Sequence, residues 1–291
     1  MTLFNQHYPA GSRAFHQLVT TQVQSALDED IGTGDLTAQL VPAAQIAKAI
    51  IIAREAAVIC GLDWVNTCFK LIDADVSIKW LVTEGARVTA NQELCELTGS
   101  ARSLLTAERC ALNFLQTLSA TATETRKYVD AIAGTNTQIL DTRKTIPHLR
   151  LAQKYAVTVG GGHNQRLALY DGVLIKENHI AAAGGIAAVM QQALSIKTNK
   201  SIQIEVENLS QLKAALAAGA TSILLDNFST ALLAEAVILN KSVAQSAILE
   251  ASGGITLENV REIALTGVDR ISIGSLTKNV QAIDLSMRFI E

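Results

Sequence analysis

The chain has 291 residues, of which 49% are hydrophobic, 18% are charged and only three are proline, which excludes disordered, collagen-like and low-complexity proteins. Its 24 Lys and Arg residues against 27 Asp and Glu give a net charge of −3, which excludes a nucleic-acid binder that relies on a generally basic surface. No apolar run reaches the roughly 18 residues of a membrane span, and the first residues lack a secretory signal pattern, so we expect a soluble protein.

The N-terminal part of the chain predicts a small α+β domain. Apolar residues recur at helical spacing from Arg13 to Leu27, and polar turn signals separate the segments that follow. The expected strands are 49–57, 76–82 and 93–97, and the expected helices are 62–72, 100–118 and a further stretch that ends near Gly134.

The four cysteines, Cys60, Cys68, Cys95 and Cys110, lie at unrelated spacings without a C-x-x-C pair. This pattern is typical of reduced, buried thiols and favours neither a disulfide framework nor a zinc site. We therefore expect the protein to be cytoplasmic.

After Gly134 the sequence changes to seven short apolar runs, each of which ends in polar residues or glycine. Helical segments such as 209–218 and 257–265 separate several of the runs. Apolar strands that alternate with helices indicate a parallel sheet, and this number of strands favours a closed or partly open α/β barrel. The runs are TQILDTRK (137–144), YAVTVGGGH (155–163), GVLIKENH (172–179), IQIEVEN (202–208), SILLDNF (222–228), AILEASGGI (247–255) and RISIGSLT (270–277).

The polar residues of these runs stand at the carboxyl ends of the expected strands, where α/β barrels build their active sites. The runs end with cations at Arg143, Lys144, Arg166 and Lys176, and with carboxylates that include Glu205 and Asp226. Arginine forks and mobile lysines suit a polyanionic substrate. A web of structural salt bridges at the barrel mouth is the alternative.

Two late glycine loops predict a phosphate site, because their backbone N–H groups are exposed at the strand ends. Plain connecting turns are the alternative for each loop. The residues of the loops are Ser252, Gly253, Gly254, Gly274 and Ser275.

A dedicated zinc site is not expected, because no two histidines have metal-ligand spacing. His179 in the KENH string is either an orienting or a structural residue. Glu205 and Asp226, if they face phosphates, suit Mg²⁺ shared with substrate oxygens.

Nine strings in order resemble the quinolinate phosphoribosyltransferase family, and the resemblance covers nearly the whole chain. The strings are DEDIGTGDLT (28–37), LLTAERCALNFLQTLS (104–119), DTRKTIP (141–147), GGGHNQR (160–166), LIKENH (174–179), IEVEN (204–208), LLDNF (224–228), SGGI (252–255) and ISIGSLTKNVQAIDLSMRF (271–289).

The resemblance implies a type II phosphoribosyltransferase fold: an α/β sandwich over 1–117, completed by about 277–291, and an open α/β barrel over 118–276. It implies a homodimer or hexamer. The implied activity is the transfer of phosphoribose from phosphoribosyl pyrophosphate (PRPP) to quinolinate with decarboxylation. This magnesium-dependent reaction of NAD biosynthesis gives nicotinate mononucleotide, pyrophosphate and CO₂.

The resemblance also assigns the acid-binding residues. Arg143, Lys144 and Arg166 match the residues that hold the quinolinate carboxylates, and Arg109 matches an arginine that the partner subunit supplies. Gln165 stands where the family usually has a histidine, so the pocket loses a charge but keeps an amide donor. His148 stands where the family commonly has glycine, which leaves the loop conformation open.

The remaining residues match positions that bind PRPP in the family. Lys176 matches a residue between quinolinate and the pyrophosphate, and Glu205 and Asp226 match carboxylates near the ribose hydroxyls and Mg²⁺. The expected catalytic residues are Lys144, Lys176, Glu205 and Asp226. The residues matched to the 5-phosphate loops are Ser252, Gly253 and Gly274.

Three alternatives remain open from the sequence. One is a related transferase that acts on nicotinate or another acid and releases no CO₂. A second is a Schiff-base aldolase that uses Lys176 as its nucleophile. The third is a barrel that binds ligands without catalysis.

Overall fold

The computed structural model describes residues 8–196 and 198–290 and divides into two compact units. The first unit contains the described residues up to Arg126, Ile146–Gly161 and the described residues from Leu276 onward. The second unit contains Lys127–Thr145 and Gly162–Ser275. The chain therefore passes between the units several times.

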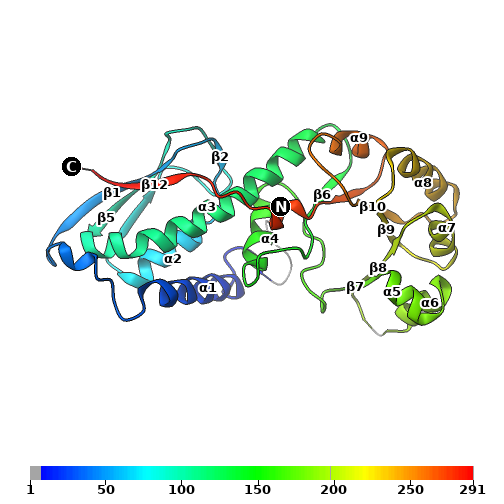
Figure 1. Ribbon diagram of the computed structural model, residues 1–291, viewed down its shortest axis with the longest axis horizontal. Coiled ribbons are helices and arrows are strands. Elements are labelled where there is room, and N and C mark those ends of the chain that lie inside the picture. The colour runs from blue at the N-terminus through cyan, green and yellow to red at the C-terminus, as the bar shows by residue number, and fades with distance from the viewer. Residues whose placement is uncertain (1–7, 197, 291) are drawn as a thin grey trace. The chain divides into compact units, whose positions relative to one another are not determined.

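The first unit is built on a four-stranded antiparallel sheet in the order β12-β1-β5-β3. Figure 1 shows the C-terminal strand β12 beside β1, which lies near the other end of the sequence. The elements are α1 (Arg13–Ile31), a 3-10 turn (Ala38–Leu40), β1 (Ile46–Ala53), β2 (Ala57–Val58), α2 (Leu62–Ile72), β3 (Ser77–Trp80), β4 (Arg87–Val88), β5 (Glu93–Ser100), α3 (Ala101–Ala131), α4 (Arg150–Val159), α10 (Ser275–Lys278) and β12 (Leu285–Ile290).

The core of this unit follows from helical periodicity. Helix α1 buries Phe15, Val19, Val23 and Leu27, which are four residues apart and therefore lie on one face. The Phe15 ring meets the rings of Trp64 and Tyr155 at centroid distances of 5.6 and 5.2 Å. This cluster joins α1, α2 and α4 within one hydrophobic core.

The second unit is a six-stranded parallel sheet in the order β6-β11-β10-β9-β8-β7. Helices α5 to α9 lie outside the strands (Figure 1), and α6 to α9 bury apolar side chains, which confirms the expected α/β architecture. The elements are β6 (Gln138–Leu140), β7 (Gly172–Ile175), α5 (Glu177–Ala183), α6 (Ile186–Ser195), β8 (Ser201–Val206), α7 (Leu209–Ala217), β9 (Ser222–Asp226), α8 (Thr230–Ser242), β10 (Ile248–Ser252), α9 (Val260–Leu265) and β11 (Arg270–Ser272).

The prediction of a barrel strand within residues 155–163 is wrong. The run 155–163 is mainly the end of helix α4, and only His163 forms an isolated parallel bridge, to Leu140. Periodicity cannot distinguish a five-residue apolar run from a buried helix turn. Helix α4 ends at Gly160, where a Cβ would lie only 2.7 Å from the Thr125 side chain, so this close approach requires glycine.

Two other sequence predictions can be compared with these elements. Residues 101–131 form one continuous helix where the sequence suggested two stretches. All four cysteines are buried and carry free thiols, as expected. Within the described residues, no helix combines the length and apolarity needed to cross a membrane.

Candidate functional site

A cavity of about 510 Å³ opens at the carboxyl end of the parallel sheet in the second unit. Each strand except β6 contributes a lining residue from its own range. The loop after β6 supplies Arg143 and Lys144, and the segments before and after β7 supply Arg166 and Lys176. The lining residues are Thr142, Arg143, Lys144, Gln165, Arg166, Leu174, Lys176, Glu205, Leu224, Asp226, Asn227, Glu250, Ser252, Gly253, Gly254 and Ser272. Most of the sequence-predicted residues are therefore gathered around one cavity.

The arginine pair gives one side of this cavity its positive charge. Arg166 Nη1 donates to the carbonyl oxygen of Gly172 at 2.9 Å, which ties its guanidinium to the start of β7. Burial, and then the neighbouring Arg143 guanidinium, lowers the pKa of Arg166. Two cations held close together without full solvation form a site for an anion.

Lys176 and Glu205 face each other across neighbouring strands. Lys176 Nζ lies 3.0 Å from Glu205 Oε2, and the Glu205 side chain is the more buried of the two. The backbone N–H of Lys176 donates to Nδ1 of His179 at 3.0 Å, which caps α5 and fixes the end of β7. His179 therefore positions the backbone of Lys176.

The loops after β9 and β10 hold each other in place. Asn227, with φ of 55°, donates its backbone N–H to the Ser252 carbonyl oxygen at 2.9 Å. Its side chain donates to Asp226 Oδ2 at 2.8 Å. Gly253 has φ of 97°, and a Cβ there would overlap the Asn227 amide. Glycine is thus required where these two strand ends meet.

The last glycine loop lies next to Lys144. A Cβ at Gly274 would lie 3.0 Å from the Lys144 side chain, so the backbone and this lysine are packed closely. Gly274 and Ser275 do not line the cavity, although both were predicted to bind substrate. The Ser275 Oγ atom is buried and has no hydrogen-bond partner among the described residues.

A chain of polar side chains links two residues that line the cavity, Gln165 and Glu250, through the buried Gln203. Gln165 Nε2 donates to Gln203 Oε1 at 2.9 Å, and Gln203 Nε2 donates to Glu250 Oε2 at 2.9 Å. The buried Asp141 accepts from the Gln165 backbone N–H at 2.9 Å and from the Asn164 side chain at 2.6 Å. Gln203 was not predicted from the sequence as a site residue. It lies two positions before Glu205 in β8, so the two side chains point to the same face of the sheet.

The donors available to a metal are the carboxylates of Glu205 and Asp226, which both line this cavity. Within residues 8–196 and 198–290, no three His, Cys, Asp or Glu residues gather as a metal-binding group. Two hard oxygen donors fit a Mg²⁺ ion that keeps water and substrate ligands, and do not fit a metal cage made only of protein.

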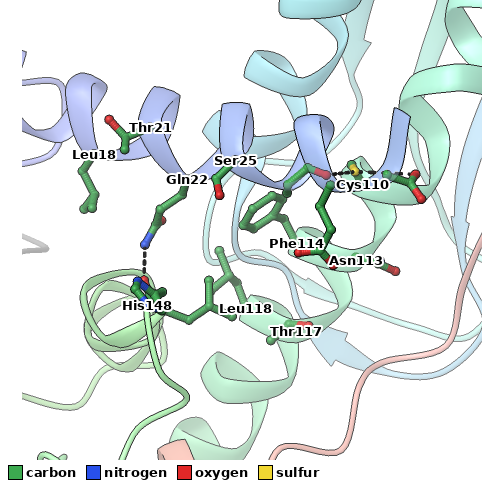
Figure 2. A pocket seen from close by; sticks show the side chains of 14 residues that line it. Leu18, Thr21, Gln22, Ser25, Cys110, Asn113, Phe114, Thr117, Leu118 and His148 are labelled. Atoms are coloured by element: carbon green, nitrogen blue, oxygen red, sulfur yellow. Dashed lines mark hydrogen bonds between the residues drawn. The ribbon is translucent and has the colours of Figure 1, made fainter. Parts of the chain in front are cut away.

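A second cavity, of about 570 Å³, lies in the first unit between α1 and α3 (Figure 2). In it Gln22 Nε2 donates to the His148 carbonyl oxygen at 2.9 Å, and Cys110 Sγ lies 3.8 Å from Asp30 Oδ2. Its charged lining residues are Glu29 and Asp30. A cavity with this acidic lining does not suit an anionic substrate.

Arg109, the other predicted substrate residue, is exposed on α3 in the first unit. The adjacent Glu108 carboxyl has a pKa raised by burial and lowered in part by the Arg109 charge. Arg109 lines neither of the two cavities described above.

Comparison with known proteins decides the family. Residues 35–119 match the N-terminal domain of quinolinate phosphoribosyl transferase, and residues 121–288 match its C-terminal domain. The chain belongs to the quinolinate phosphoribosyltransferase family. At the two positions where departures from the family pattern are expected from the sequence, Gln165 donates to Gln203 and His148 adopts φ of 62°.

Other quinolinate phosphoribosyltransferases resemble the chain along almost its whole length. A nicotinate-nucleotide pyrophosphorylase structure from Francisella tularensis superposes with a TM-score of 0.91 at 46% identity, over 94% of this chain and 97% of that one. The probable carboxylating nicotinate-nucleotide pyrophosphorylase of Synechocystis sp. is 40% identical over 94% of this chain and 93% of its own length. The enzyme of that name from Mycobacterium leprae is 40% identical over 91% of this chain and 95% of its own length.

Proposed function

We propose that the protein transfers phosphoribose from PRPP to quinolinate with loss of CO₂, which yields nicotinate mononucleotide and pyrophosphate for NAD biosynthesis. The observation that carries this proposal is the cavity of the second unit, which combines an arginine pair, the Lys176–Glu205 pair and a glycine loop. Family membership and the names of the relatives support the same activity.

In this proposal, the arginine side of the cavity binds the acid. Arg143 and Arg166 hold the two carboxylates of quinolinate, because guanidinium forks match carboxylate geometry. Lys144 adds a mobile positive charge, and the Gln165 amide supplies a neutral hydrogen-bonding group. This arrangement orients the ring nitrogen toward C1 of the ribose.

The opposite side binds PRPP. Ser252, Gly253 and Gly254, which line the cavity, receive the 5-phosphate. Gly274 and Ser275, at the start of α10, would reach the phosphate from outside this lining. Glu205 and Asp226 face the ribose hydroxyls. Lys176, held by Glu205, lies between the acid and the leaving pyrophosphate.

The transfer step then needs charge stabilisation more than covalent chemistry. The ring nitrogen of quinolinate displaces pyrophosphate at C1, and positive charge develops on the ribose as the C–O bond breaks. Glu205 and Asp226 stabilise this charge, as carboxylates do in glycosyl transfer. Lys176 and Lys144 stabilise the negative charge that develops on the leaving group.

Glu205 and Asp226 would hold a Mg²⁺ ion that arrives with PRPP, and the ion would supply positive charge to balance the leaving pyrophosphate. After transfer, the ring nitrogen is quaternary and positively charged. The carboxylate on the neighbouring carbon leaves as CO₂, because the charged ring stabilises the electron pair that remains. A proton replaces it on that carbon.

The proposed assembly is a homodimer or hexamer in which Arg109 reaches the partner's site. The exposure of Arg109 on α3 supports this role. The free thiols of all four cysteines are in line with the proposed reducing cytoplasm.

The ion pair between Lys176 and Glu205 also argues against a Schiff-base aldolase. A Schiff-base lysine must be an uncharged amine, whereas Lys176 Nζ is paired with a carboxylate at 3.0 Å.

The test is an assay with PRPP, quinolinate and Mg²⁺ that follows CO₂ and pyrophosphate together. We expect equal amounts of both products. Pyrophosphate release with nicotinate and no CO₂ would identify the related transferase instead. Binding of PRPP and quinolinate without any product would show that the barrel is not an enzyme.

A further inference from the structure

Glu250 is a buried carboxyl group that the proposed mechanism does not use. It lies in the middle of β10, is 1% exposed, and lines the substrate cavity. Its Oε2 accepts a hydrogen bond from Gln203, but Oε1 has no hydrogen-bond partner among the described residues. A buried oxygen without a partner is costly, which makes Oε1 a candidate contact for a ligand.

The surroundings of Glu250 favour its uncharged form. No Lys, Arg or His nitrogen of the described residues lies within ion-pair distance of Glu250. Burial raises the pKa of the Glu250 carboxyl, and the hydrogen bonds with Gln203 and Ser272 and the charge of Arg270, its cross-strand partner on β11, offset this only in part. The other charged groups around the cavity are Arg143, Lys144, Arg166, Lys176, Glu205 and Asp226, and His163 lies near Arg270.

Hydrogen bonds connect Glu250 to the acid-binding side of the cavity. Gln203 joins Glu250 to Gln165, and each step is 2.9 Å long. Gln165 precedes Arg166 in the chain, and both line the cavity. Glu250 is therefore one side chain away from the residues proposed to hold the acid.

The chemistry of the acid substrate decides which form of Glu250 can contact it. Quinolinate at neutral pH offers only acceptors, namely two carboxylates and a ring nitrogen. An ionised Glu250 would repel it, whereas a protonated Glu250 could donate to it. Carboxylic acids kept neutral by burial serve as hydrogen-bond donors in other enzymes.

We infer that Glu250 carries a proton and donates a hydrogen bond from Oε1 to a carboxylate oxygen of bound quinolinate. The inference rests on the proposed function for the identity of the acid. The proton remains on Glu250 and no covalent bond changes. Gln203 acts as a positioning residue, because its donation to Oε2 leaves Oε1 as the oxygen that faces the ligand.

The test measures the dissociation constant of quinolinate, without PRPP, between about pH 6 and about pH 9 by calorimetry. Above the pKa of Glu250 in the free protein, binding must take up a proton, so affinity falls by about tenfold per pH unit. Glu250→Gln keeps a permanent N–H donor, and we expect it to lack this fall. Glu235→Gln, the same change on the exposed side of α8, is the matched control and retains the fall.

A second variant keeps the inference testable if Glu250→Gln does not fold. Glu250→Asp keeps a carboxyl group that can be protonated but shortens it, so the pH dependence should remain while affinity drops by about tenfold. Calorimetry of the unaltered protein in buffers of different ionisation enthalpy counts the protons taken up directly.

Identical pH dependence in the unaltered protein and Glu250→Gln would overturn the inference, as would binding without proton uptake at every pH. Failure of the proposed function looks different. In that case the unaltered protein forms no nicotinate mononucleotide from PRPP and quinolinate at any pH, whatever the pH dependence of quinolinate binding.

Discussion

Lys176 Nζ at the end of β7 lies 3.0 Å from Glu205 Oε2 on β8, so the parallel pairing of two strands places a cation and a carboxylate together at the cavity. Neither charge is paired with a residue close to it in sequence. Parallel strands bring their carboxyl ends to the same edge of the sheet, and this pair exists because of that geometry.

Loss of the Lys176 charge should reduce turnover strongly. We expect Lys176→Met to lower kcat by about 100-fold to 1,000-fold, because a preorganised positive charge opposite the leaving group is removed. Steady-state assays with PRPP and quinolinate measure this effect. Lys213→Met on the exposed face of α7 is the control and should leave kcat unchanged. An unchanged kcat in Lys176→Met would contradict the assigned role.

Arg166 should contribute mainly to binding of the acid. Arg166→Ala is expected to weaken quinolinate binding by about tenfold to 100-fold, since a charge-assisted pair of hydrogen bonds is lost. Arg166→Lys should restore only part of the affinity, because an ammonium lacks the planar fork. Calorimetry of quinolinate binding checks both variants. Arg288→Ala, at an exposed position, is the control and should bind quinolinate as the unaltered protein does. If Arg166→Ala also bound quinolinate as tightly as the unaltered protein, the assignment would be wrong.

His148 should carry backbone strain. Its φ of 62° lies in the left-handed region, which costs a non-glycine residue free energy. His148→Gly relieves this strain but makes the unfolded chain more flexible, so we expect a net gain of about 0.5 to 1 kcal/mol in the free energy of unfolding. Thermal unfolding should show an increase in Tm. His148→Val, whose branched side chain tolerates this conformation poorly, should lower Tm.

Glu84 should make the stability of the first unit depend on pH. Its carboxylate accepts from the backbone N–H groups of Gly61 and Leu62 at the start of α2, at 2.8 and 3.1 Å. Burial nevertheless raises the pKa of Glu84 above its ordinary 4.5. The folded chain therefore holds this proton more tightly than the unfolded chain.

The direction of the Glu84 effect follows from proton binding. As pH rises from about 4.5 through the raised pKa, the free energy of unfolding falls, and the loss is complete above that pKa. Glu84→Gln has no proton to lose, so its free energy of unfolding should not show the part of the decrease with pH that Glu84 causes. Denaturant titrations of both chains at several pH values measure the difference. If the free energy of unfolding depended on pH in the same way for both chains, Glu84 would not titrate in this way.

The sequence predicted elements best where one periodicity dominated. The bounds of α2 match the prediction at both ends, because its apolar residues follow one helical stripe. The run 155–163 was misassigned because it is short, and because its burial comes from packing against the first unit's core.

The candidate site was predicted in large part because its residues end strands. Arg143, Lys176 and Asp226 lie far apart in sequence, yet each follows or closes a strand of the same parallel sheet. Gln203 was missed because it lies inside a strand, where polar residues are usually expected to point to solvent.

By itself the sequence determined the class of fold, the reduced cysteines and the set of polar residues at strand ends, because periodicity and composition are local properties. Only the tertiary structure decided which of these residues share a cavity, and that Gln165, Gln203 and Glu250 form one hydrogen-bonded chain. The physical reason is that hydrogen bonding and burial depend on side chains from different strands, whose pairing and register no local pattern specifies.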